Sequence, residues 1–172
     1  MACNTLTEIL KGCEGNLGGL TKLWIGNGDS ITASTIVDGE VTGATATEVF
    51  VEYQFNPNTS NFVESTTVDL ATSSTFYTSV ITLQLARREA AKRQSLLLIA
   101  KGQPELSIMV KDSNGTYWMF GLNDDKVFLT GDEGGSGQAK ADLNGYLLTF
   151  TAETAEPALQ VDSATAGVIG GF

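Results

Sequence analysis

Histidine is absent from this chain, and its absence excludes several kinds of chemistry at once. Histidine is the commonest general base, the usual partner of serine and cysteine nucleophiles, and a frequent ligand of transition metals. We therefore expect neither an enzyme nor a bound cofactor. Runs of about 18 or more apolar residues are also missing, so no membrane-spanning helix is predicted.

Cysteine is scarce, because only Cys3 and Cys13 are present, both near the start of the chain. Two cysteines cannot complete a tetrahedral zinc site without histidine. The first residues lack the basic stretch and apolar core of a signal peptide. The pair is therefore expected as reduced thiols made in the cytoplasm, with a disulfide as the alternative.

Bases are few as well, with 10 Lys and Arg against 20 Asp and Glu and a net charge of −10. Such a chain repels the phosphates of nucleic acids, so tight nucleic-acid binding is not expected. The 42% of hydrophobic residues over 172 positions suits one folded domain with its own core, spanning residues 1–172.

Alternation of apolar and polar residues, broken by turn-forming dipeptides, predicts a chain made mainly of strands. Asn114-Gly115 predicts the turn of one hairpin and Asn144-Gly145 the turn of the last. A further hairpin is expected from the strands at 49–55 and 62–70. The predicted strands are residues 20–25, 49–55, 62–70, 76–85, 105–111, 116–122, 126–130 and 146–152, with a loop at 131–137.

Two regions fit this pattern poorly. Residues 28–48 are rich in threonine and weakly patterned, which is typical of a long loop or a hairpin arm. Residues 157–172 are small and glycine-rich, and predict an extended C-terminal tail that docks on a neighbouring surface.

One helix is predicted at about 86–101, where the apolar spacing changes from two residues to that of a helix. Gly102 and Pro104 supply its end. The predicted fold is therefore an antiparallel β-sandwich or barrel with one flanking helix.

Half of all the bases fall within this predicted helix, with Glu89 as the one local acid. Two interpretations remain open: a solvated face that balances an acidic domain, or a face that meets an acidic surface of an identical subunit. The apolar last turn at 96–99 needs cover on more than one side, and a subunit contact would provide it. The candidate interface residues are Arg87, Arg88, Lys92, Arg93, Leu96 and Ile99, with Lys101 as the fifth base.

Two other stretches suggest ligand sites but lack the required spacing. The glycine-rich run 131–140 is not a phosphate loop, because Lys140 is followed by Ala141 and a strand. A set of acids would suit calcium, yet it lacks the calcium-loop pattern, and solvated turn acids are expected. These acids are Asp124, Asp125, Asp132, Glu133 and Asp142.

Several segments are familiar in their order along the chain: the start from Cys3 to Cys13, then 16–25, the strand 76–80 before the basic helix, 111–118 and 135–146. Together they resemble the tail tube proteins of tailed bacteriophages. The resemblance implies a β-sandwich flanked by one helix, six copies in a ring, and rings stacked into a hollow tube through which the genome leaves the virion.

The resemblance also implies a location in the virion tail and contacts with other tail and connector proteins. An acidic lumen would let DNA pass without specific binding. A long arm would reach the next ring, and residues 28–48 and the C-terminal tail are the candidates for it.

Two alternatives remain. One is another virion protein, such as a head–tail connector or a capsid-stabilising protein. The other is a monomeric β-sandwich that binds sugars or peptides, which would need a discrete aromatic patch. The larger aromatic residues are instead scattered through alternating strands, where core packing accounts for most of them. They are Trp24, Tyr53, Tyr77, Tyr117 and Trp118.

Overall fold

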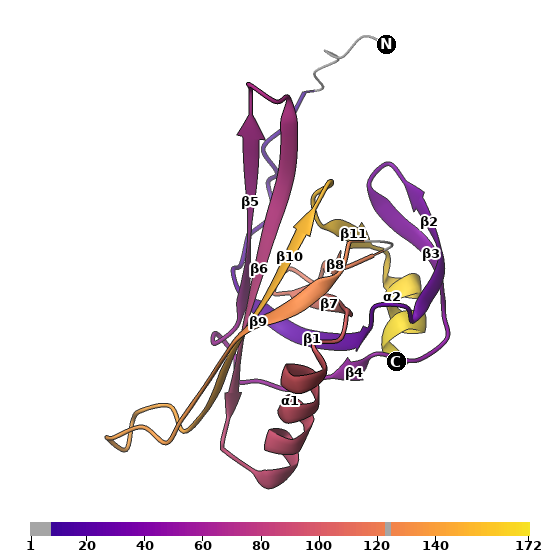
Figure 1. Cartoon of the computed structure of the whole chain (residues 1–172). Helices are drawn as coiled ribbons and strands as arrows, with labels where there is room; N and C mark the ends of the chain where they lie inside the picture. The colour runs from indigo at the N-terminus through magenta and orange to yellow at the C-terminus, as the bar shows by residue number, and fades with distance from the viewer. Residues whose placement is uncertain (1–7, 123–124) are drawn as a thin grey trace.

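A computed structural model describes residues 8–122 and 125–172 (Figure 1). Over these residues the fold is mainly β, as predicted, with eleven strands and two helices. The helices are α1 (Ala90–Gly102) and α2 (Ser163–Gly170). The strands are β1 (Leu20–Asn27), β2 (Ile31–Val37), β3 (Glu40–Ala46), β4 (Val51–Glu52), β5 (Asn61–Asp69), β6 (Ser74–Ala86), β7 (Leu106–Asp112), β8 (Tyr117–Phe120), β9 (Val127–Gly135), β10 (Gly145–Thr154) and β11 (Leu159–Val161).

The strands form one continuous sheet that is folded into two layers. The first layer has the order β5-β6-β10-β9, and the second contains β4, β1, β7, β8, β11, β3 and β2 in that order. Leu106 of β7 pairs with Val127 of β9 and so connects the layers. Among the described strands, β3 and β11 pair in parallel and every other pair is antiparallel.

The main core lies between the two layers. Along β6 the buried residues are Ser79, Ile81, Leu83 and Leu85, every second residue, because successive side chains of a strand point to opposite faces. Leu148 and Phe150 of β10 join them from the neighbouring strand. The predicted alternation of 76–85 is therefore confirmed, and burial of this apolar surface is the main stabilising contribution.

A second core lies on the other face of the second layer. Trp24 and Met109 point into it from β1 and β7, and α2 covers it with Ala166 and Ile169. Strand β7 therefore contributes side chains to both cores, which explains its three consecutive apolar residues at 108–110. Tyr117 also lies in the second core, so core packing accounts for it as expected.

The C-terminal residues do not form the predicted extended tail. They form β11 and α2, which pack against the chain's own second layer. The Asp162 side chain caps α2 by accepting a hydrogen bond from the Thr165 amide at 2.5 Å. This bond holds the pKa of the Asp162 carboxyl below its usual value. Neither described helix is long and apolar enough to cross a membrane.

Residues 49–55 were predicted as a strand paired with 62–70, and this pairing is wrong. Only Val51–Glu52 pairs, with β1, while β5 pairs with β6. The alternating pattern has another cause: Tyr53 and Phe55 pack against the main core from an extended segment. Burial there raises the pKa of the Tyr53 hydroxyl.

The two remaining turn predictions have different outcomes. Residues 28–48 contain the hairpin β2–β3, one of the two alternatives, with Asp38 and Gly39 at positive φ angles of 51° and 84° in its turn. The hairpin β7–β8 across Asn114-Gly115 is confirmed. In contrast, β9 continues to Gly135 through the predicted loop, and the final reversal occupies residues 136–144 rather than Asn144-Gly145.

Candidate assembly surfaces

The basic residues lie around the junction between β6 and α1, and not all on the helix. Strand β6 continues to Ala86, which pairs with Gly145, and Arg87 has a positive φ of 63°. The helix therefore begins at Ala90, and the prediction that Arg87 and Arg88 are helical is wrong. Helical periodicity alone could not reveal this turn, because it depends on the pairing of β6 with β10.

Three of these bases have local partners. The Arg87 Nε and the Lys92 Nζ atoms both contact the Glu89 carboxylate, at 3.2 and 3.6 Å. Lys92 also donates to the Ala86 carbonyl at 2.7 Å, and the Arg88 guanidinium lies 5.4 Å from the centre of the Tyr146 ring. These bases therefore stabilise the β6–α1 turn, whatever else they contact.

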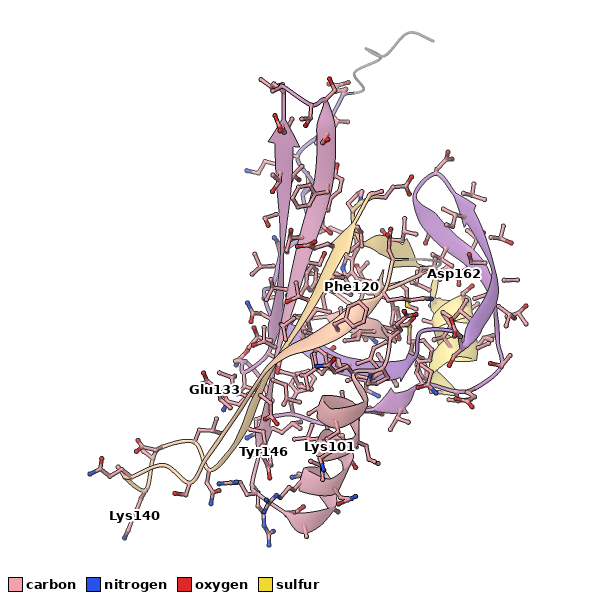
Figure 2. All side chains as sticks on the ribbon, in the orientation of Figure 1. Lys101, Phe120, Glu133, Lys140, Tyr146 and Asp162 are labelled. Atoms are coloured by element: carbon pink, nitrogen blue, oxygen red, sulfur yellow. The ribbon has the colours of Figure 1, made fainter. Side chains whose placement is uncertain are left out.

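Arg93 and Lys101 differ from them. Both are exposed, and neither forms an ion pair with any residue that the structure describes. Figure 2 shows Lys101 on α1 and Lys140 in the loop after β9 at the same end of the molecule. Arg93 and Lys101 are thus the helix charges that remain free for a partner.

The apolar face of α1 points largely inward. Leu96 is only 3% exposed and packs in the main core, with Ile99 half-buried beside it. Leu96 and Ile99 are therefore engaged within their own chain, and Leu96 also lines a groove beside α1. The exposed residues of this turn are Leu97 and Leu98. The sequence 96–99 is apolar on every side, so its pattern did not distinguish the inward from the outward residues.

Two adjoining grooves separate α1 from the extended segment 49–56. The first lies between Phe55 and Leu85 on one side and Ala91 and Ser95 on the other. The second lies beside Leu98 and Val51, both of which are exposed. Each groove is lined by residues more than 30 positions apart, so neither was visible from the sequence.

The hairpin β5–β6 is the longest projection from the body (Figure 1). Strand β5 forms one edge of the first layer, and all its residues except Phe62 are exposed. Val63 and Val68 are apolar side chains on this edge. An edge strand with unpaired amides and carbonyls is a site where another strand can add. The alternating pattern predicted this strand but not its position at an edge.

The structure gives no support to a ligand site at 131–142. Gly131 to Gly135 belong to β9, and the Asp142 carboxylate accepts from the amides of Gln138 and Ala139 at 2.8 and 2.7 Å. These bonds lower the pKa of the Asp142 carboxyl. The role of Asp142 is therefore to hold the backbone of its own loop. No three acidic or cysteine side chains gather as metal ligands within the described part of the chain, and Asp124 lies outside it.

Cys13 is an exposed free thiol, and Cys3 lies outside the described residues. Comparison of the chain with models of protein families, with curated proteins and with solved structures finds no significant match.

Proposed function

We propose that this protein is a structural subunit that assembles with copies of itself into stacked rings forming the hollow tail tube of a bacteriophage. The order of segments that resemble tail tube proteins supports this proposal, together with a mainly β fold that has α1 at its flank. The tube would contact other tail and connector proteins at its ends. Its function would be passive conduction of the genome and not catalysis.

The observation that carries the proposal is the open edge of the first layer. Strand β5 has nine residues and, among the described strands, pairs only with β6. Soluble proteins normally protect such an edge with charge, proline or a covering segment. On this strand Glu64 and Asp69 are the only charged residues and proline is absent. An edge of this length and polarity suits strand addition by a second copy.

The charge of the chain is compatible with a conduit. Tight binding of DNA requires bases that displace the counterions of its phosphates, and a net charge of −10 disfavours this. DNA therefore moves through such a tube without specific contacts.

Electron microscopy of the purified protein tests the proposal. We expect rings or hollow tubes, and light scattering that rises steeply with protein concentration. A protein that stays monomeric at every concentration, with or without crowding agents, would contradict self-assembly as its function.

The free charges on α1 provide a second test. Arg93→Glu with Lys101→Glu should raise the concentration needed for assembly about tenfold, equivalent to about 1.4 kcal/mol, because two exposed charges at the contact are reversed. Sedimentation of assembled material measures this concentration. The thermal unfolding of the monomer should be unchanged, since both side chains are exposed and unpaired.

A matched control has the same change in net charge at residues that do not belong to α1. Lys11→Glu with Lys140→Glu alters two exposed lysines outside the helix. Equal effects of the two pairs would show that α1 has no special role and that total charge alone controls assembly.

A further inference from the structure

The tip of the β5–β6 hairpin is an apolar projection without a partner in the described chain. Leu70 is 89% exposed, and Val68 beside it is more than half exposed. The tip is held in shape by the Asp69 carboxylate, which accepts from the Ala71 amide at 2.8 Å. A two-stranded ribbon is marginally stable in water by itself, so a formed tip with exposed leucine suits a docking element.

The first groove beside α1 has the properties of a receptor for such a tip. Leu85 and Leu96 are buried at its base, and Phe55 is half-buried on the opposite side from the helix. Its volume of about 620 Å³ far exceeds the roughly 10 to 15 Å³ that one water molecule needs. The groove therefore has room for apolar side chains of a hairpin tip.

The tip cannot reach the groove of its own chain. Strand β6 begins at Ser74, next to the tip, and ends at Ala86, which lines the groove. Thirteen residues of strand separate the two sites by about 40 Å, at roughly 3.3 Å per residue. Figure 1 shows the hairpin tip and α1 at opposite ends of the molecule. A tip can therefore fill this groove only in another copy.

The charges of the two sites are complementary. The hairpin, residues 61–86, contains two acids, Glu64 and Asp69, and no base. Residues 87–101 contain five bases and one acid, and the groove itself is lined by Lys92 and by one acid, Glu52. Opposite charge on two surfaces favours their encounter and sets their orientation.

From these observations we propose that the tip at 68–71 of one copy docks in the groove between α1 and residues 51–56 of the next copy. This inference rests on the proposed self-assembly and names the contact between successive copies along the tube. The contact is heterologous, because it joins opposite ends of the chain, so it can repeat from one copy to the next along the tube as long as the rotation between copies does not close it into a ring. The length of β6 limits each step along the assembly to about 40 Å.

Disulfide trapping tests the contact directly. With Leu70→Cys and Ser95→Cys in a chain whose two native cysteines are replaced by serine, oxidation of assembled protein should produce a ladder of linked chains on a non-reducing gel. A disulfide needs Cα atoms about 4.4 to 6.8 Å apart, so the two positions cannot pair within one chain. Both residues are exposed, so the fold should be unaffected.

The matched control is Leu70→Cys with Val168→Cys, since Val168 is exposed on α2 away from the groove. We expect about tenfold more linked chains from the Leu70–Ser95 pair, because only this pair meets the distance limit in the assembly. Equal linkage in the two pairs would overturn the tip-in-groove contact while leaving self-assembly intact. Failure of the unmodified protein to assemble would overturn both proposals.

Discussion

Replacing Phe150 with alanine should lower the free energy of unfolding by about 3 to 5 kcal/mol, the range for a buried phenylalanine. The Phe150 side chain is fully buried between the two layers, where it packs with residues of β6 and β7. Its removal leaves a cavity that rigid strands on both sides cannot close. Urea denaturation of the unassembled protein measures the loss.

Phe128 supplies the matched control for this change. It lies on the neighbouring strand β9 and is 42% exposed on the outer face of the layer. Phe128→Ala should therefore cost about 1 kcal/mol or less. Equal losses at the two positions would contradict the placement of the main core between the layers.

Replacing Gly121 with alanine should destabilise the fold by about 3 kcal/mol or more, because two effects add. Gly121 has a positive φ of 78°, which disfavours any residue with a Cβ atom. An added Cβ would also lie 2.6 Å from the Leu106 carbonyl oxygen and 2.9 Å from the Val127 side chain. Leu106 and Val127 are the residues through which the two layers pair, so the clash falls on their junction.

Gly115 separates the two effects. Its φ is 91°, but an added Cβ would meet nothing within 4 Å. Gly115→Ala should therefore show only the backbone cost of about 1 to 2 kcal/mol. Chemical denaturation of both variants gives the difference, and a Gly121→Ala variant no less stable than Gly115→Ala would contradict the close approach at the junction.

Local pattern was sufficient for the strands whose neighbours lie next to them in sequence. Strand β6 was predicted from its alternation, and the β7–β8 hairpin from Asn114-Gly115. In both cases the side-chain period and the turn residues agree with the final structure. The β2–β3 hairpin remained one of two alternatives, because its threonine-rich strands lack a strong apolar face.

Prediction failed where distant residues determine the structure. Apolar and polar residues alternate over 49–55 as in a strand, but only two of these residues pair with β1. Residues 159–170 are small and gave no strong period, yet they fill the space between β3, β8 and the second core. A cap at Asp162 and glycines at 170 and 171 were the local signals available for α2.

The sequence predicted which kinds of residue lie near α1, but not how they are arranged in space. The concentration of bases near α1 could be read from the sequence. Arg87 and Lys92 both pair with Glu89, and this follows from the turn after β6. Leu96 is buried, and this follows from the presence of the second layer. The groove beside α1 combines residues from 51–56 and 85–96, and only the folded chain brings these together.

The position of β11 has a consequence for biosynthesis. Strand β11 lies between β3 and β8, so the β2–β3 hairpin joins the rest of the sheet through a strand made about 120 residues later. Translation proceeds from the N-terminus at roughly 5 to 20 residues per second, so this hairpin waits several seconds on the ribosome without its neighbour. During that interval Val41 of β3 is not covered by β11 or α2, and the second layer is completed only after both have left the ribosome.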